Sequence, residues 1–328
     1  MSKILVTGGA GYIGSIVVQA LLESDHEVVV VDDFSTGNID AVPSGVSLVR
    51  VSYYSPLMQY VFTEHHPDTV IHLAARMSPT ESVEKPLEYF RDNVTGTLNL
   101  LTAMLEAGVS RIVFASSACV YGDPDLVLVD EASPLSPINP YGETKLMVEK
   151  ILEWYHQAYG LKYVAFRFFN VAGAVGGLGP AKSFNNGLIP YILQVPLGQS
   201  EAIPVYGNDY KTHDGTCVRD YVHVKDIAEA VELALQKIDA VNGVYNLGSG
   251  LGYSVKDIIL NTCKVLGQEI PMDIQPRRPG DPPVLVASTF KAWEQLGWVP
   301  TNSDIKTIIS DTWEWMQSHP QGYAKEEA

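Results

Sequence analysis

The chain has 328 residues, of which 46% are hydrophobic, enough for one large or two ordinary domains with a sizeable core. A formal net charge of −16 argues against a nucleic-acid-binding protein, and the three scattered cysteines indicate a reducing compartment. Neither cysteines nor histidines show metal-ligand spacing, apolar runs stay well short of the roughly 18 residues of a membrane helix, and no leader precedes the first strand. We therefore expect a cytoplasmic protein with no metal, nucleic-acid or membrane partner.

The chain opens on an apolar run, residues 3–7, followed at once by the sequence GGAGYIG and then by helical periodicity. Three glycines fall between the predicted strand and the predicted helix: Gly8, Gly11 and Gly14. The first suits a tight turn, the second lets the backbone approach a pyrophosphate, and the third lets the helix press closely against the sheet. Free N–H groups at the helix start then face the phosphates of a dinucleotide.

A second buried strand, residues 28–31, ends at Asp32. A carboxylate at this place accepts hydrogen bonds from both ribose hydroxyls and repels a 2′-phosphate. The unit therefore predicts a site for NAD rather than NADP. The polar loop that follows is placed to line the adenosine pocket with Asp33, Ser35, Thr36 and Gly37.

Strands and helices alternate from there to residue 168. We expect strands at 47–51, 69–74, 111–116 and 162–168, and helices at 56–66, 87–107 and 141–159. This alternation predicts a Rossmann-type doubly wound parallel sheet, an α/β fold that binds ligands at the carboxyl ends of its strands. The fourth strand ends in residues that leave room for a cofactor there: Leu73, Ala74 and Ala75. Asn93 lies inside the helix 87–107, where periodicity alone favours a solvated position.

The second half changes character, because Gly, Pro and Asn interrupt residues 171–216. A further strand at 244–247 returns to the main sheet. We therefore divide the chain into an NAD-binding domain, residues 1–170 with about 217–250, and a smaller, discontinuous α/β substrate lobe, about 171–216 and 251–328. Two helices of this lobe are expected to be capped by Ser254 and Ser303 and to run to Leu266 and Ser318.

Tyr141 and Lys145 are four residues apart on a predicted helix, so their side chains lie on one face. A phenol is a poor base at pH 7 unless its anion is stabilised, and Lys145 supplies positive charge for that purpose. Ser117, at the end of the fifth strand, is placed to donate a hydrogen bond to a substrate oxygen. A second pair with the same spacing, Tyr221 and Lys225, lies in an alternating, extended stretch that separates the two side chains, so we set it aside.

Taken together, the glycine turn, Asp32, Ser117 and the Tyr141 and Lys145 pair resemble the extended short-chain dehydrogenase/reductase family. Longer matches make the resemblance more specific and span nearly the whole chain: IHLAA, ESVEKPLEY, NVTGTLNLL, SSACVYGD, NPYGETK, RFFNVAGA, GTCVRDYVHV, GNDYKTHDGT, YNLGSG and RRPGDP. The resemblance implies tightly held NAD, a UDP-hexose substrate and a homodimer in which the helices 87–107 and 141–159 of two copies pair.

The resemblance also implies a role for each matching position. It makes Tyr141 the base and acid, Lys145 the residue that binds the NAD ribose and tunes the pKa of Tyr141, and Ser117 their hydrogen-bonding partner. It implies NAD contacts at Tyr12, Ile13, Asp32, Asp33, Leu73, Ala74, Asn93 and Phe168. It implies contacts with the uracil, ribose and diphosphate of the substrate at Asn170, Leu188, Tyr206, Arg219, Arg278 and Asp281, where the arginines make physical sense as diphosphate clamps.

The reaction implied by the resemblance is NAD-dependent 4-epimerisation of UDP-glucose and UDP-galactose through a 4-keto sugar. Related enzymes that dehydrate or decarboxylate sugar nucleotides carry an acid just after the strand-end Ser or Thr, where this chain has Ala118 and Cys119, so simple epimerisation is favoured. UDP-N-acetylglucosamine and UDP-pentose 4-epimerisation stay open as alternatives. A non-catalytic NAD-binding redox sensor is an alternative from another class.

Several positions depart from the family pattern. The region Arg50–Tyr53 (RVSY) replaces a Gly-Asp pair that helps to bind adenine, and Met77 replaces a lysine that would contact nicotinamide. Gly187, beside Asn186, replaces an Asn or His. Leu285 matches the position that gates room for an N-acetyl group, and its medium size leaves acetylated substrates undecided.

Overall fold

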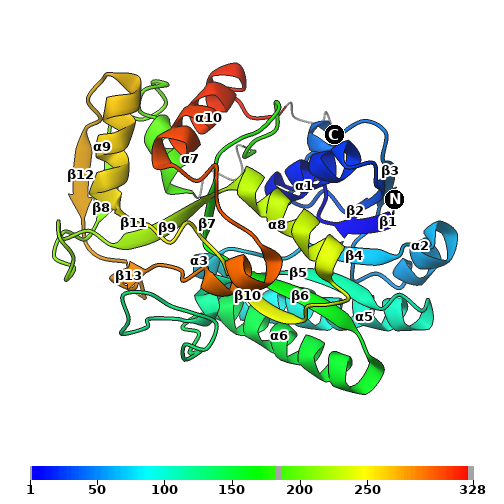
Figure 1. Ribbon diagram of the computed structural model, residues 1–328. Coiled ribbons are helices and arrows are strands. Elements are labelled where there is room, and N and C mark those ends of the chain that lie inside the picture. The colour runs from blue at the N-terminus through cyan, green and yellow to red at the C-terminus, as the bar shows by residue number, and fades with distance from the viewer. Residues whose placement is uncertain (1, 182–186, 279, 324–328) are drawn as a thin grey trace.

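The structure of the protein is a computed structural model that describes residues 2–181, 187–278 and 280–323. Its main sheet has seven parallel strands in the order β10-β6-β5-β4-β1-β2-β3 (Figure 1). They are β1 (Lys3–Thr7), β2 (Glu27–Asp32), β3 (Ser47–Arg50), β4 (Thr69–His72), β5 (Arg111–Ser117), β6 (Lys162–Phe168) and β10 (Gly243–Leu247). The order runs outward from β1 in both directions, so the predicted doubly wound α/β sheet is confirmed.

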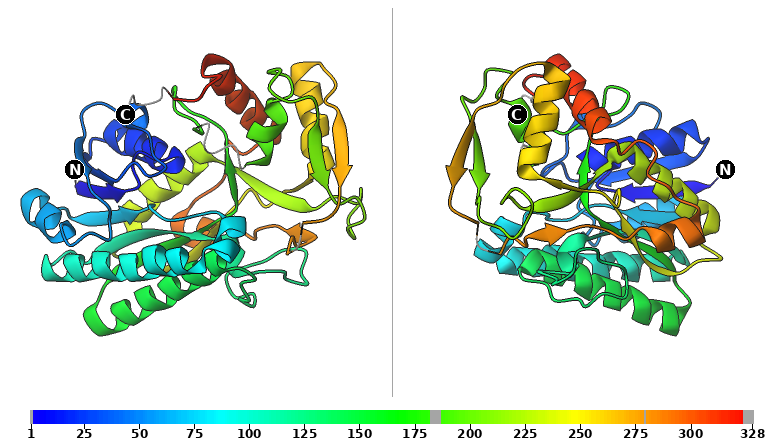
Figure 2. Two further views of the ribbon diagram at one scale, coloured as in Figure 1. Left: turned by 180° about the vertical axis from the view of Figure 1, so that it is seen from behind. Right: turned by 60° about the vertical axis from the view of Figure 1, so that its left-hand side comes forward.

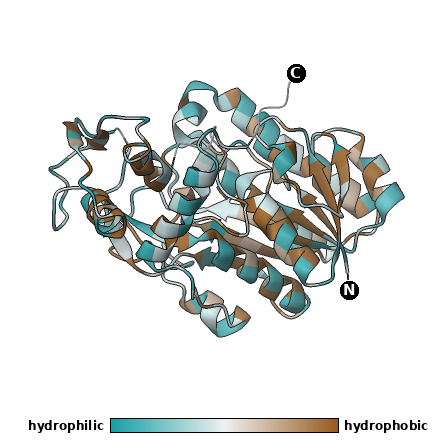
Figure 3. Ribbon diagram, turned by 90° about the horizontal axis from the view of Figure 1, so that it is seen from above, coloured by the Kyte–Doolittle hydropathy of each residue, from teal (hydrophilic) through white to brown (hydrophobic). Residues whose placement is uncertain are grey.

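Helices cover both faces of this sheet (Figure 2). On one face lie α1 (Tyr12–Glu23) and α8 (Val224–Lys237), and on the other lie α2 (Met58–His65), α5 (Gly96–Glu106) and α6 (Pro140–Tyr159). Neighbouring residues of one strand serve different faces, since Val6 packs in the first core and Leu5 in the second. Burial on both sides explains the apolar runs of the inner strands, such as ILV in β1 and VVVV in β2, and Figure 3 shows brown strands in this sheet.

The smaller lobe is attached at the carboxyl edge of the main sheet, because the chain enters it directly after β6. One of its sheets contains β7 (Asn170–Ala172), β9 (Val218–His223), β11 (Gly252–Ser254) and β13 (Val284–Leu285), and a second contains β8 (Ile203–Tyr206) and β12 (Met272–Gln275). Its helices are α7 (Leu188–Leu193), α9 (Val255–Leu266) and α10 (Ile305–Ser318). Side chains of these helices and sheets share a core of their own.

The chain crosses between the two parts more than once. After β9, the elements α8 and β10 return to the main sheet, and η5 (Ala292–Leu296) packs in the core beside α8. The strand β9 pairs with β7, β11 and β13. Our division of the chain stays a prediction, and these pairings favour a boundary that assigns β9 to the smaller lobe.

The predicted helix 87–107 is built from three segments. These are α4 (Pro86–Tyr89), the π-helical η2 (Phe90–Thr95) and α5. Shorter helical segments elsewhere are η1 (Ile39–Ala41), α3 (Pro79–Glu84) and η3 (Ala118–Val120). Within the described residues, no helix combines the length and the apolar character needed to cross a membrane.

One of the two predicted helix caps in the lobe is confirmed. Ser254 caps α9 and forms a capping box with Asp257. Ser303 is the wrong cap for α10, because the carboxylate of Asp304 accepts the N–H bonds of the first turn. Ser303 instead accepts a hydrogen bond of 2.8 Å from the N–H of His223, which ties α10 to β9.

Candidate active site

The glycine-rich turn between β1 and α1 is packed too tightly for side chains. Gly8 has a φ of +75°, and a Cβ there would meet the backbone nitrogen of Ala74 at 2.6 Å. A Cβ on Gly14 would overlap the carbonyl oxygen of Gly8, so this glycine packs against the turn itself as well as against the sheet. Gly11 precedes α1 and gives it no side-chain cap. The result is a bare backbone cradle at a helix N-terminus, which fits the pyrophosphate of a dinucleotide.

Asp32, the last residue of β2, is buried and holds this turn in place. Its carboxylate accepts hydrogen bonds from the N–H of Ala10 at 3.0 Å and from that of Phe34 at 2.9 Å. Burial raises the pKa of Asp32 and outweighs those bonds. Burial also acts to raise the pKa of the neighbouring Asp33, but hydrogen bonds from two serines outweigh burial, so the pKa of Asp33 is lowered. Both carboxylates lie where we predicted the adenosine end of NAD.

The other predicted NAD contacts lie around the same edge of the main sheet. Each of these residues either ends a strand or lies in the helix or loop that follows a strand. They are Tyr12 and Ile13 at the start of α1, Ser35, Thr36 and Gly37 after β2, Leu73, Ala74 and Ala75 after β4, and Phe168 at the end of β6. Their roles toward NAD stay predictions.

Asn93 is buried, so the solvated position expected from helical periodicity is wrong. Its Oδ1 accepts a hydrogen bond of 2.9 Å from the N–H of Arg76, and its Nδ2 donates to the Arg76 carbonyl at 3.0 Å and to Thr144 Oγ1 at 3.1 Å. Asn93 thereby fastens the loop after β4 to α6. It lies in the π-helical η2, a kind of segment that is frequent at functional sites.

The three predicted reacting groups meet where β5 ends against α6. The side chains of Ser117 and Tyr141 are hydrogen-bonded to each other. The Nζ of Lys145 donates a hydrogen bond of 2.7 Å to the carbonyl of Ala115 and lies 5.8 Å from the centre of the Tyr141 ring. All three side chains are buried. The second pair with this spacing, Tyr221 and Lys225, does not share a helix, because Tyr221 lies in β9 and Lys225 in α8.

Burial dominates the ionisation of these groups. It raises the pKa of Tyr141, although the hydrogen bond with Ser117 acts in the opposite direction. It lowers the pKa of Lys145 to about 7, while Glu149 and Cys119 raise it. The protein groups alone therefore keep Tyr141 protonated at neutral pH, and a further positive charge, such as that of oxidised nicotinamide, is needed to lower its pKa.

The predicted diphosphate clamps have different surroundings. Nη2 of Arg219, in β9, lies 3.3 Å from Oδ1 of Asp281, and its Nη1 also donates to two backbone carbonyls. The guanidinium of Arg278 is exposed and lies 3.8 Å from the centre of the Tyr206 ring. A stacked guanidinium keeps the donors at its edge available to a phosphate. Four of the predicted substrate residues thus form two contacting pairs.

The remaining substrate residues are placed individually. Asn170 begins β7 and hydrogen-bonds the side chain of Tyr221. Leu188 begins α7 and packs against the core of the smaller lobe. Leu285, which matches the position that gates room for an N-acetyl group, lies in β13 and is buried in a cluster that includes Ala118 and Phe169.

Cys119 was not among the predicted site residues, yet it is in contact with Ser117 and interacts electrostatically with both Lys145 and Arg219. Its N–H donates a hydrogen bond of 3.2 Å to the Oγ of Ser117. Burial raises the pKa of its thiol, which is also within electrostatic reach of Arg219 and Lys145. Its place after a strand end was visible in the sequence, but a lone cysteine is no signal of a site.

Three departures from the family pattern acquire a structural description. Met77 is exposed, and the neighbouring Arg76 turns its guanidinium to Asp92 and Glu88, at 2.6 and 2.9 Å. In the segment RVSY, the Oγ of Ser52 donates a hydrogen bond of 2.8 Å to Asp33. Gly187 precedes α7, and the adjacent residue 186 lies outside the described residues.

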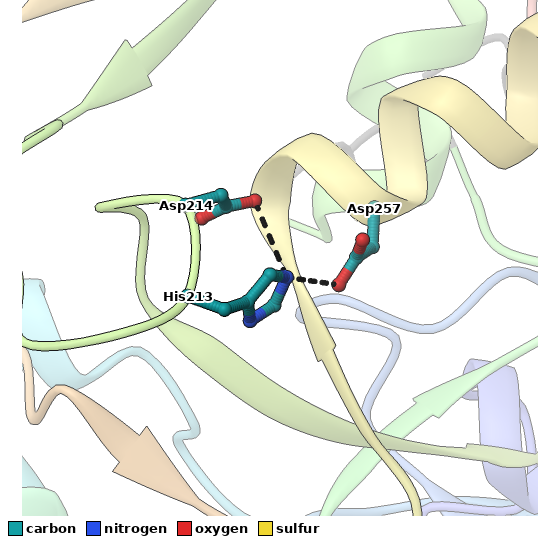
Figure 4. A group of neighbouring side chains, drawn as sticks. All are labelled: His213, Asp214 and Asp257. Atoms are coloured by element: carbon teal, nitrogen blue, oxygen red, sulfur yellow. Dashed lines mark ion pairs between the residues drawn. The ribbon is translucent and has the colours of Figure 1, made fainter.

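A histidine and two carboxylates gather in the smaller lobe (Figure 4). Nε2 of His213 lies 3.1 Å from Oδ2 of Asp257 and 3.7 Å from Oδ2 of Asp214. Asp257 already caps α9, and Asp214 accepts hydrogen bonds from Ser254 and Thr216. Ion pairing and capping therefore account for this cluster.

Comparisons with known proteins agree with the fold and with the family resemblance. The sequence model described as "NAD dependent epimerase/dehydratase family" matches residues 4–248. A protein of Halalkalibacterium halodurans named UDP-glucose 4-epimerase is 46% identical over 333 residues, covering 98% of each chain. A crystal structure of a UDP-glucose 4-epimerase has a TM-score of 0.95 and 45% identity, covering 98% of this chain and 100% of the other. The enzyme of that name from Bifidobacterium longum, in complex with NAD+ and UDP, has a TM-score of 0.92 and 37% identity, with 98% and 100% covered.

Proposed function

The chain belongs to the NAD dependent epimerase/dehydratase family, and on that premise we propose that it interconverts UDP-glucose and UDP-galactose by NAD-dependent epimerisation at carbon 4. The observation that carries the proposal is the meeting of Ser117, Tyr141 and Lys145 in a chain that is similar to UDP-glucose 4-epimerases over nearly its full length.

Tyr141 is the group that removes the proton from the 4-hydroxyl of the sugar and later returns it. Ser117, which hydrogen-bonds Tyr141, also donates a hydrogen bond to the sugar oxygen, and Lys145 supplies positive charge beside the phenol. NAD held by the glycine-rich turn and Asp32 would supply the hydride acceptor and donor for carbon 4, through which the configuration of the sugar would be inverted. Proton and hydride are both given back, so the cycle has no net oxidation.

Changing the face of the sugar requires that the nucleotide stay bound while the hexose turns. We assign this task to the smaller lobe, through Arg278 stacked on Tyr206 and through Arg219 paired with Asp281. Asn170 and Leu188 complete the set of proposed UDP contacts. The positions after Ser117, Ala118 and Cys119, carry no carboxylate, which favours epimerisation over dehydration or decarboxylation.

Two further parts of the proposal concern the protein as a whole. We infer that it works in the cytoplasm, where three free cysteines are compatible with the reducing conditions. We also infer that it is a homodimer through α5 and α6, whose outward faces lie next to each other (Figures 1 and 2).

The experiment is to purify the protein without added cofactor, supply UDP-galactose, and follow UDP-glucose together with absorbance at the NADH wavelength. Conversion without added NAD and without net NADH is expected. Accumulating NADH without UDP-glucose would mean an oxidation whose keto product leaves. The matched variant Tyr141→Phe keeps the ring and is expected to lose turnover by at least about a hundredfold, the contribution of one acid–base group.

The same assay separates the alternatives. Parallel reactions with UDP-N-acetylglucosamine and with UDP-pentoses report whether those sugars are also accepted. A wild-type protein that retains NAD but turns over none of these substrates would leave the redox-sensor alternative in place.

A further inference from the structure

The catalytic face of α6 continues one turn beyond the groups used so far. Tyr141, Lys145 and Glu149 follow one another at intervals of four residues and therefore lie on one side of the helix. Each meets the end of β5: Tyr141 at Ser117, Lys145 at the carbonyl of Ala115, and Glu149 at Ser116, whose Oγ donates to Glu149 Oε1 at 2.5 Å.

Glu149 is also half of a buried ion pair. Arg167, in β6, donates from Nε to Oε1 at 3.0 Å and from Nη2 to Oε2 at 2.7 Å, and only 5% of the Glu149 side chain and 3% of the Arg167 side chain are exposed. A two-pronged contact of this kind fixes orientation as well as charge. Burying it costs desolvation, so a simple stabilising role explains it poorly.

The network crosses three strands at one level of the sheet. Ser116 is opposite Arg167, and Arg167 is opposite Asn246 in β10. Tyr121 closes the row, because its hydroxyl accepts from Arg167 Nη1 at 2.9 Å and donates to Asn246 Oδ1 at 2.7 Å. This row of polar side chains includes Ser116, so in β5 it lies one residue before Ser117 and next to the reacting groups.

We propose that Glu149 is a positioning residue of the reaction, which fixes the end of β5 against the helix that carries Tyr141 and Lys145. This inference rests on the proposed function, because it assigns the contact between Glu149 and β5 a role in the proposed epimerisation. A second effect follows from charge: the carboxylate lies one helical turn from the buried ammonium of Lys145 and favours its protonated form.

Two variants separate position from charge. Ser116→Ala removes the bond between β5 and Glu149 but leaves the ion pair and its charge. Glu149→Gln keeps an acceptor for Ser116 but removes the charge. The control is Glu153→Gln, the same substitution one turn further along α6, where the carboxylate accepts from Tyr163 and Gln157.

For Ser116→Ala we expect kcat on UDP-galactose to fall about tenfold, as for a small misplacement of reacting groups, with KM and the pH profile unchanged. For Glu149→Gln we expect a larger loss of kcat. We also expect the decline of kcat at high pH to begin about one pH unit lower than in the wild type. Unchanged kcat in Ser116→Ala, or an equal loss in Glu153→Gln, would overturn the positioning role. Ser116→Ala leaves the buried Arg167 paired with Glu149, so this variant tests the positioning role even if Glu149→Gln does not fold.

The ionisation of Lys145 has a readout that needs no turnover. In NAD-bound protein labelled with 13C at lysine Cε, the Lys145 resonance is identified by its absence in Lys145→Met and titrated by NMR. Its midpoint is expected to move down by about one pH unit in Glu149→Gln and to stay in place in Ser116→Ala. An unmoved midpoint in Glu149→Gln overturns the effect of charge. A wild type inactive on every UDP-sugar would refute the proposed function, while this titration would still report on Glu149.

Discussion

The hydroxyl of Tyr12, at the start of α1, donates a hydrogen bond of 2.6 Å to the carbonyl oxygen of Gly173, in the loop that follows β7. Further along that loop, the hydroxyl of Tyr323 accepts from the N–H of Gly179 and donates to its carbonyl, each at 3.1 Å. Trp315, in α10, donates to the next carbonyl of the loop at 3.1 Å. Tyr12 thus fastens the entry to the smaller lobe to the helix whose N-terminus we propose faces the pyrophosphate of NAD, and Tyr323 and Trp315 hold the same loop further along.

Loosening this attachment is expected to speed the loss of NAD. Tyr12→Phe and Tyr323→Phe each remove one hydroxyl, and a hydrogen bond of this kind contributes about 1 kcal/mol. We expect NAD to leave about fivefold faster from either variant, measured as cofactor retained during dialysis. The control Tyr60→Phe alters a tyrosine that is 74% exposed on α2. Equal retention by all three variants would contradict a role for the attachment.

Asp32 is expected to set the choice between NAD and NADP. Its carboxylate orders the turn through Ala10 and Phe34, and its charge opposes a 2′-phosphate. Asp32→Asn keeps the size and one acceptor oxygen but loses the charge. We expect the ratio of the Kd for NADP to the Kd for NAD to fall about tenfold or more, measured by calorimetry. Asp40→Asn, in η1, is the control, and an unchanged ratio in Asp32→Asn would assign the discrimination to other residues.

The nucleotide end of the site could be predicted because its signals are local. Buried parallel strands are apolar runs of the right length, and Gly8, Gly11 and Asp32 have fixed places relative to them. The cap of α10 was missed by one residue because Ser303 and Asp304 are both good caps, and the choice depends on the contact between Ser303 and β9.

Side chains with distant partners could not be predicted. Asn93 looked solvated because helical periodicity assumes an α-helix, whereas η2 is π-helical and its Asn93 bonds to Arg76 and Thr144. Glu149 repeats the spacing of Lys145, but its partner Arg167 emerges only from the register of β6 beside β5. The sequence marks such residues as polar positions in otherwise apolar elements and does not tell what they contact.

His72, at the end of β4, is expected to destabilise the fold in acid. Burial, with help from Lys145, lowers its pKa to about 3 from the ordinary 6.5. Its two ring nitrogens lie 2.7 Å from Thr7 Oγ1 and 3.0 Å from Thr97 Oγ1. Below pH 6.5 the unfolded chain takes up a proton that the folded protein refuses, so the stability that His72 contributes at pH 7 is lost progressively as the pH falls toward 3.

Between pH 7 and pH 5 this difference amounts to about 2 kcal/mol. In urea unfolding with saturating NAD, we expect the free energy of unfolding to fall less between pH 7 and pH 5 in His72→Gln than in the wild type. The difference between the two proteins is expected to be about 2 kcal/mol. The control His65→Gln changes a histidine on the surface helix α2. A wild type and a His72→Gln variant with the same dependence on pH would show that the unfolded chain and the folded protein bind this proton equally.

The proposed dimer makes a prediction about α6. Its outward face carries Trp154, 67% exposed, while Leu87, at the start of the α4 segment, is 78% exposed. Large apolar side chains at these places are what an interface between two copies buries. We expect a dimer by sedimentation equilibrium and a dissociation constant weakened about thirtyfold or more in Trp154→Glu, the cost of losing a buried aromatic anchor. Trp293→Glu is the control, because Trp293 is also exposed but lies in η5, which packs on the α8 face of the main sheet, opposite α5 and α6. A monomeric wild type, or equal effects of the two substitutions, would remove α6 from the interface.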